Sequence, residues 1–277
     1  MGNKGFHGFS GLFRVYNPYA IIGEKRLSLT SNTPVTGDVT AATRVYWTDG
    51  ETNLSVAVPA TTVTPFDVFY SLSGNCLSTV NWANDTTRAV ALARDTYGRR
   101  VKSGDTEKLY LGWGRTTSVS GQCEKSFSKL FLRNHYNPKR VKVGVYESTN
   151  SWSSDGLGAW RAARGQTSNR VEILCDADEP IILDVAGCCK GGAGGYGLFG
   201  IAVDATNTND CATDGHSYLG TFAVNNHIIP TYGRLNKVMS EGYHYFQWTE
   251  VDWAVVITFY SKNSTFRQSG ISGFVMA

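Results

Sequence analysis

Hydrophobic and polar residues alternate along many short runs of this chain, and polar breaks separate the runs. Such alternation places one face of a strand on a core and the other face in water, whereas a helix repeats its apolar residues at wider spacing. The breaks contain the glycine, proline, asparagine and aspartate residues that turns favour. The pattern predicts strands at residues 26–30, 43–47, 54–58, 66–72, 108–112, 141–146, 171–175, 180–186, 196–203 and 218–224.

The last third of the chain shows this pattern most clearly. Residues 242–250, 251–260 and 268–277 follow one another with little spacer and are rich in aromatic and β-branched residues, so they predict three consecutive strands. Their aromatic side chains fit a core or a subunit interface, and stacking on the sugar rings of a cell-surface glycan is the alternative. These residues are Tyr243, Tyr245, Trp248, Trp253 and Tyr260.

Two segments have a helical spacing instead. In residues 123–133, Phe127, Leu130 and Phe131 occupy positions i, i+3 and i+4, which predicts a short helix that links two β modules. In residues 86–94, apolar residues follow the cap-forming pair Asn84 and Asp85 and predict a turn or two of helix. A strand that ends nearby is supported equally well by the sequence.

Together these elements predict an all-β protein. We expect a docking leader at residues 1–23, an N-terminal β module at 24–118, a linker with a short helix at 119–138, and a C-terminal antiparallel jelly-roll-like or sandwich-like module at 139–277. The leader interleaves aromatic residues with glycine, asparagine and proline, which suits anchoring to a partner surface. Its aromatic residues are Phe6, Phe9, Phe13, Tyr16 and Tyr19.

Charge and hydropathy limit the partners. A net charge of +3 over 277 residues is close to neutral, so we expect no nucleic-acid partner. No apolar run reaches the length of about 18 residues that a membrane-spanning helix needs, so we expect no membrane insertion. The first residues lack the apolar region and cleavage site of a secretory signal, and we therefore expect the protein to stay in the compartment where it is made.

The six cysteines do not form a metal-ligand pattern, because no two of them have Cys-x-x-Cys spacing. We expect neither a metal nor a cofactor. A disulfide that joins Cys188 or Cys189 to Cys211 or Cys175 is one interpretation of the remaining pattern. Buried free thiols that pack as small hydrophobic residues are the alternative.

No catalytic motif stands out. The glycine cluster at residues 187–197 lacks the features of a phosphate-binding loop and predicts a hairpin loop, no Gly-x-Ser-x-Gly motif occurs, and the five histidines are scattered. We therefore expect no enzyme. The remote alternative is a polysaccharide-degrading tailspike that uses a pair of carboxylates. The loop carboxylates are Asp155, Asp176, Asp178, Glu179, Asp204, Asp210 and Asp214.

Stretches along nearly the whole chain resemble a family of virion-associated proteins of tailed bacteriophages, variously labelled tail-fibre or capsid-associated. The similarity runs in the family's order through residues 17–24, 26–36, 66–69, 82–88, 101–106, 134–137, 242–245 and 268–273. This sequence departs from the family's pattern at residues 46–50 and 259–263, and its cysteines look like additions. The resemblance brings no catalytic residues with it.

The resemblance implies a structural protein on the surface of the virion, assembled in the host cytoplasm. We expect a homotrimer, because the jelly-roll heads of fibres and decorations usually bury an aromatic inner face. We also expect the protein to contact other virion proteins, either as a capsid decoration or head-fibre protein, or as a tail fibre or receptor-binding tip. In the second case, loops 148–158 and 206–214 would contact the host. The chain has no heptad pattern or long repeat of the kind that a fibre shaft shows, which favours the first.

Overall fold

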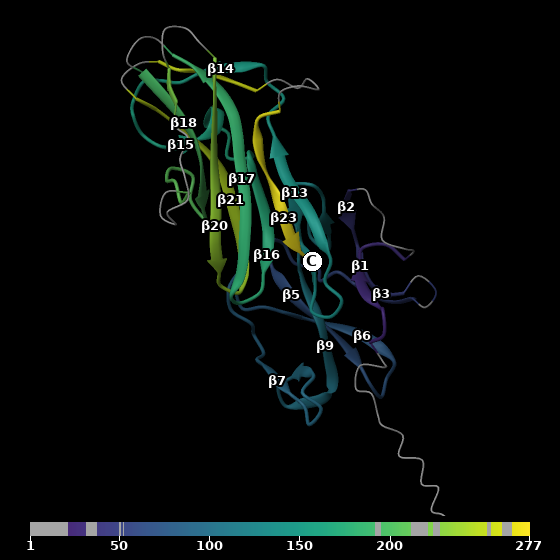
Figure 1. The fold of residues 1–277 in the computed structure, drawn as a ribbon. Helices are drawn as coiled ribbons and strands as arrows, with labels where there is room; N and C mark the ends of the chain where they lie inside the picture. Colours follow the sequence, from purple (N-terminus) through teal and green to yellow (C-terminus); the bar gives the residue numbers. More distant parts are fainter. Residues whose placement is uncertain are drawn as a thin grey trace, which may run out of the picture.

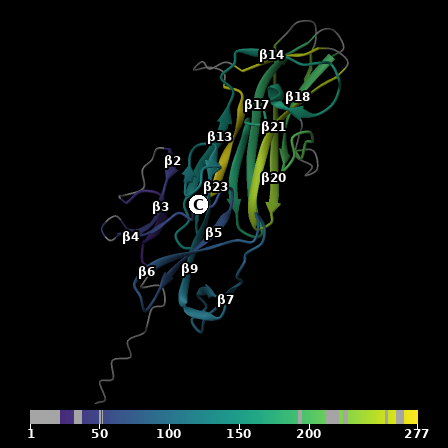
Figure 2. The same cartoon turned by 180° about the vertical axis from the view of Figure 1, so that it is seen from behind.

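The computed structural model describes residues 22–31, 38–49, 51, 53–191, 195–211, 221–223, 228–253, 256–261 and 268–277. The predicted all-β class is confirmed, since these residues form strands β1 to β23 and one 3-10 turn, η1 (Ala163–Gly165), with no α-helix among them. The molecule is elongated. Strand β14 lies at one end and β7 at the other, in the front view (Figure 1) and from behind (Figure 2).

The N-terminal half contains two sheets that share an apolar core. One sheet has the order β1-β3-β4, and the other has the order β6-β5-β9-β8-β7, with β12 also paired to β9. Phe66, Val68, Leu109 and Leu111 point from the larger sheet into the core, where they meet Trp47 from the smaller one. The strands are β1 (Arg26–Ser28), β3 (Arg44–Thr48), β4 (Asn53–Ala57), β5 (Pro65–Ser71), β6 (Cys76–Asn81), β7 (Leu92–Arg94), β8 (Arg100–Lys102), β9 (Asp105–Arg115) and β12 (Leu132–Asn134).

The C-terminal half is a sandwich of two sheets. One sheet has the order β13-β23-β17-β22-β14, with β20 paired along the other edge of β17. Along β17 the burial alternates: Ile181, Leu183 and Val185 are buried, while Ile182 faces out, as the alternating sequence predicts. The strands are β13 (Arg140–Tyr146), β14 (Ser151–Ser153), β17 (Glu179–Lys190), β20 (Ile229–Met239), β22 (Thr258–Tyr260) and β23 (Gly270–Met276).

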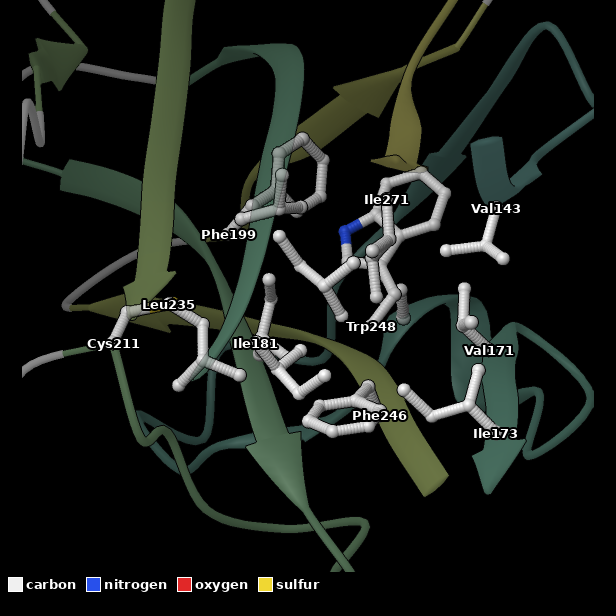
Figure 3. Packing of buried hydrophobic residues seen from close by; sticks show 14 of the residues in the cluster. Val143, Val171, Ile173, Ile181, Phe199, Cys211, Leu235, Phe246, Trp248 and Ile271 are labelled. Atoms are coloured by element: carbon white, nitrogen blue, oxygen red, sulfur yellow. The ribbon is translucent and has the colours of Figure 1, made fainter. Parts of the chain in front are cut away.

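The facing sheet has the order β19-β18-β21-β16-β11-β10-β2, with β15 paired to β21. Phe199, Phe246 and Trp248 from this sheet pack against Ile181 and Ile271 from the other, and together they form the largest apolar cluster (Figure 3). The strands are β2 (Val39–Ala42), β10 (Cys123–Lys125), β11 (Lys129–Leu130), β15 (Arg161–Ala162), β16 (Arg170–Cys175), β18 (Gly195–Val203), β19 (Thr221–Ala223) and β21 (Gly242–Trp253).

This facing sheet also joins the two halves. Strand β2 comes from the N-terminal half and pairs with β10, β10 pairs with β11, and β11 runs parallel to β16 of the sandwich. Leu130 lies in the sandwich core while the next residue, Phe131, lies in the N-terminal core. Neighbouring residues of extended backbone point to opposite sides, so this short segment contributes one side chain to each core.

Both helix predictions are wrong. Residues 123–133 form the short strands β10 and β11 and the start of β12, and the spacing of Phe127 and Leu130 arises because a turn lies between them. Residues 86–94 form turns and then β7, since Thr86 and Thr87 are held by an Asx-type turn at Asn84 and a bridge back to it. In both places local polar bonding and pairing with distant strands override the helical spacing.

One strand boundary and one connection also differ from prediction. Strand β21 runs without a break through Glu250 and ends at Trp253, whereas the sequence predicted a break after residue 250. The glycine-rich segment after Lys190 is not a hairpin loop, because β17 and β18, which it connects, belong to different sheets of the sandwich.

Candidate functional site

The predicted site residues lie in different parts of the molecule. The leader aromatics Phe6, Phe9, Phe13, Tyr16 and Tyr19 fall outside the described residues. Trp248 is fully buried in the sandwich core, where it meets Trp152 and Phe199 at ring-centroid distances of 5.9 and 5.0 Å. Trp248 therefore stabilises the fold and is not available to a partner. Tyr260, on β22, is half-buried.

Tyr243 lies where the two halves meet. Its ring faces the Arg115 guanidinium, with 3.7 Å from Cζ to the ring centroid, and its hydroxyl donates a 2.6 Å hydrogen bond to Glu172. Burial, followed by the Glu172 carboxylate, raises the pKa of Tyr243 and keeps it neutral. Arg115 in turn forms a two-pronged ion pair with Asp85. These contacts fix the start of β21 against the N-terminal half.

Tyr245, two residues further along β21, packs against Arg170 instead. The Arg170 guanidinium lies over its ring, with 4.8 Å from Cζ to the ring centroid.

Trp253 differs from the other aromatics because it is exposed at the end of the sandwich furthest from the N-terminal half. Its side chain is 53% exposed and stacks on its cross-strand partner Tyr196, with ring centroids 5.8 Å apart and an interplanar angle of 10°. Leu157 is 76% exposed, and the residue after it, Gly158, lies against the Trp253 ring. We call Leu157, Tyr196 and Trp253 the tip patch.

Two buried carboxylates on β21 hold the loop that carries Leu157. The Asp252 side chain accepts hydrogen bonds from the backbone N–H groups of Gly156 at 2.6 Å and Gly158 at 3.0 Å. The Glu250 side chain accepts from Trp152 Nε1 at 2.6 Å and from Arg161 Nε at 3.0 Å. Burial raises the pKa of Glu250, while the hydrogen bond from Trp152 and the charge of Arg161 act against that rise.

A third carboxylate fixes the base of the same loop. Glu147 accepts from the side-chain amide of Asn169 at 3.0 Å, from the backbone N–H of Thr149 at 2.9 Å and from Arg164 at 3.2 Å. Although burial opposes it, these hydrogen bonds lower the pKa of Glu147 and keep the side chain ionised. Residues 147–158, which include β14, are therefore braced at both ends, and the loop after β14 presents the apolar side chain of Leu157 to solvent.

The other loop carboxylates also bond to the protein itself. Asp176 and Glu179 both pair with Arg133, Asp210 pairs with Lys237, and Asp204 lies 2.7 Å from His244 Nδ1. Among the residues that the structure describes, no group of three or more histidine, cysteine, aspartate or glutamate side chains is placed to hold a metal ion. Within the same residues, no helix is long and apolar enough to span a bilayer. Asp178 lies in the same turn as Asp176, and Asp214 lies outside the described residues.

The cysteines follow the free-thiol alternative. All six are free, so the predicted disulfide among Cys175, Cys188, Cys189 and Cys211 is not formed. Cys175, Cys189 and Cys211 pack within the sandwich core as small apolar side chains, while Cys188 faces the opposite side of β17 and so points away from them. Burial raises the pKa of the Cys189 thiol to about 11, which keeps it protonated.

Sequence reasoning singled out Trp253 but missed its two neighbours. Tyr196 stands within the glycine cluster, where its ring is the bulky side chain among small ones, and Leu157 stands between two glycines of a polar loop. An aromatic or aliphatic residue isolated among glycine and polar residues was the available signal, because nothing nearby in sequence could bury it.

Comparisons with known proteins give no family. No family model matches the chain, and no curated protein matches it. Among solved structures, it is similar to a chain from "Structure of infectious bursal disease virus Gx strain", with 11% sequence identity and a TM-score of 0.19. The similarity covers 81% of this chain and 62% of that chain. At that TM-score the likeness carries no argument about fold or function.

Proposed function

We propose that this protein is a structural component of the surface of a bacteriophage particle, of the capsid-decoration or head-fibre type. The observation that supports it best is that buried charged side chains form their hydrogen bonds and ion pairs within the protein. Arg133, Glu147, Glu250 and Asp252 are each engaged in bracing a loop or joining two strands. The hydrogen bonds and ion pairs of these four side chains keep the scaffold rigid, which suits a structural role rather than catalysis.

The two ends of the molecule suit different tasks. Ile22, the first described residue, is buried in the N-terminal core, so the leader joins the molecule at that half. The tip patch includes the start of β18 and the end of β21, in the part of the sandwich that follows β14, and Figure 1 shows β14 and β18 at the end opposite β7. In this proposal the leader anchors the protein to another virion protein and the sandwich projects outward.

The anchoring step can be tested with purified particles. Replacing Phe9, Phe13 and Tyr16 by serine removes three large apolar side chains of the leader, and we expect this variant to fold but to stop co-sedimenting with particles. Trp253→Ser is the matched control, because it removes one exposed aromatic side chain at the opposite end. Co-sedimentation of the leader variant at the wild-type level would contradict the anchoring role.

A tail fibre or receptor-binding tip is the second candidate, and the tip patch is the observation that favours it. The stacked rings of Tyr196 and Trp253, on β18 and β21 beside the braced loop, offer a flat surface on which the ring of a host glycan can stack. We expect a Tyr196→Ser, Trp253→Ser variant to remain on the particle but to reduce adsorption to host cells. Tyr97→Ser, which removes an exposed aromatic ring of the N-terminal half, serves as the control.

We also propose that the protein forms a homotrimer through the outer face of the sheet that contains β17 and β23. Phe274 and Ile182 are direct cross-strand partners there, and both are exposed, as are Met276 and Val238. Charged side chains border these apolar ones, with Arg140 at 4.1 Å over the Phe274 ring. Phe274→Lys would place a charge in the centre of this interface. We expect a trimer for the wild-type protein and a monomer for the variant in analytical ultracentrifugation; a wild-type monomer at micromolar concentration would refute the trimer.

A further inference from the structure

A hollow lined by arginine side chains lies in the N-terminal half, beside β7 and β8. Its volume is about 560 Å³, within the range of small-ligand sites. Arg88, Arg94 and Arg100 line it, together with Glu241 and the threonines Thr86 and Thr87. The hollow is far from the tip patch and shares no residue with it.

Arg88 is a fixed part of the wall. Its Nε donates to both oxygens of Asp67 at 3.1 and 3.2 Å, its Nη2 donates to the Tyr110 hydroxyl at 3.1 Å, and its Nη1 pairs with Glu241. The guanidinium also lies over the Trp82 ring at 4.4 Å. These contacts hold Arg88 rigidly and engage the carboxylates of Asp67 and Glu241, so neither carboxylate is available to neutralise the other two arginines.

Arg94 and Arg100 are direct cross-strand partners on β7 and β8. Like charges placed opposite each other destabilise a strand pair unless a counter-charge lies between them. Arg94 donates from Nη1 to the neutral carbonyl of Gly98 at 2.7 Å. Within the described part of the chain, the Arg100 side chain forms no hydrogen bond or ion pair, and no carboxylate pairs with either guanidinium.

A neighbouring histidine is affected by the same positive charge. His135 packs on the Tyr110 ring at 5.3 Å, and its pKa is lowered to about 4, first by burial and then by Arg100. Arg94 and Arg88 lower it further, and Asp176 acts in the opposite direction. His135 can therefore report on any anion that neutralises these arginines.

We propose that this hollow binds a sugar-sized ligand that carries a phosphate or a carboxylate, with Arg94 and Arg100 as the pair that binds the charged group. Planar guanidinium groups donate paired hydrogen bonds to such oxyanions. The Thr87 hydroxyl supplies a neutral donor and acceptor for the rest of the ligand, and the Thr86 hydroxyl, which donates to Asn84 at 3.1 Å, supplies an acceptor. Binding also removes the repulsion between the two arginines. The proposal holds whether the protein decorates a capsid or forms part of a tail.

The test is a titration of the full chain with glucose 6-phosphate, glucuronate and glucose, followed by calorimetry and by the NMR signal of His135. We expect one or both acids to bind, glucose not to bind, and the affinity to fall as salt rises. The bound anion should raise the pKa of His135. Binding of glucose 6-phosphate alone identifies phosphate as the recognised group, and binding of glucuronate alone identifies carboxylate.

Arg100→Gln and Arg94→Gln should each weaken binding by about tenfold or more, since each removes a charge-assisted contact. Arg44→Gln is the control, because Arg44 is an exposed arginine on β3 bonded to Ser55. Both hollow variants should keep the wild-type melting temperature or exceed it, because each removes one of two repelling charges. The proposal is overturned if neither acid binds, if glucose binds equally well, or if the folded variants retain wild-type affinity.

Discussion

Single residues decide several features that the sequence pattern leaves open, and Gly112 is the clearest example. It lies at the bulge in β9, where the register with β5 shifts between Val68 and Phe69. Its φ is +150°, and a Cβ at this position would lie 2.2 Å from the carbonyl oxygen of Arg133. No larger residue fits, because β12 pairs closely against β9 at this point.

Gly112→Ala should therefore destabilise the protein by about 2 to 4 kcal/mol, through the clash with β12 and the strained backbone. Gly98→Ala is the matched comparison, since Gly98 also has a positive φ but no atom lies within 4 Å of the point that a Cβ would occupy. That variant should lose only about 1 kcal/mol. Chemical denaturation measures both, and equal losses would show that the contact with β12 is unimportant.

His135 should make stability depend on pH. Its pKa is about 4 in the folded protein against the ordinary value of 6.5, so the unfolded chain binds more protons between these values. The stability contributed by neutral His135 is complete above pH 6.5 and is lost as pH falls towards 4. With allowance for partial exposure, the loss is on the order of 1 to 2 kcal/mol. Denaturation of His135→Gln at both ends of this range should show a shallower pH dependence than wild type, and an unchanged slope would contradict the assignment.

At the scale of elements, the sequence predicted most of the longer strands but missed the 11-residue strand β20 and short strands such as β7, β8, β10 and β11. It also predicted neither the absence of helix in residues 86–94 and 123–133 nor the way the elements join. Residues 171–175 and 141–146 have an alternating or continuous apolar pattern, and both form strands there. Leu130 and Phe131 resemble a helical face because they are adjacent apolar residues near Phe127, yet they point into different cores.

Leu130 and Phe131 point into different cores because β11 pairs with β16 and β12 pairs with β9, and both partner strands are distant in sequence. The same limit applies to the candidate site. The tip patch could be predicted only as far as Trp253, because its pairing with Tyr196 depends on the register of β18 and β21.

Arg133 joins β12 to three other strands, β16, β17 and β23. From β12 it donates to the carbonyl oxygens of Leu174 at 3.1 Å and Met276 at 2.7 Å, and it pairs with Glu179 at 2.7 Å. Arg133→Met would leave Glu179 and both carbonyls without these partners, and should cost about 3 to 5 kcal/mol. Adding Glu179→Gln removes the unpaired charge and should recover at least about 1 kcal/mol. If the double variant is no more stable than the single one, the ion pair is not the source of the loss.

At the scale of the whole molecule, the continuous sheet from β2 to β19 makes the two halves one folding unit. The sheet passes from the N-terminal core to the sandwich through β10 and β11, and Tyr243 and Arg115 add contacts where the halves meet. Elements that share a sheet and two cores cannot unfold separately without exposing apolar surface in both.

We therefore expect one cooperative unfolding transition. Tryptophan fluorescence and far-ultraviolet circular dichroism should give coincident denaturation curves, since Trp47, Trp82 and Trp113 report on the N-terminal half and Trp248 reports on the sandwich. Replacing Leu130 by aspartate, which places a charge in the sandwich core at the joining strand, should shift both curves together. Two separate transitions would show that the halves are independent domains.

The central claim, that this is a structural protein of a phage particle surface, is tested most directly by counting its copies in purified virions against the major capsid protein. We predict hundreds of copies per particle, as expected for a capsid decoration. A handful of copies would instead place the protein at the tail or at a single vertex and direct attention to the tip patch. Absence from purified virions would contradict the claim.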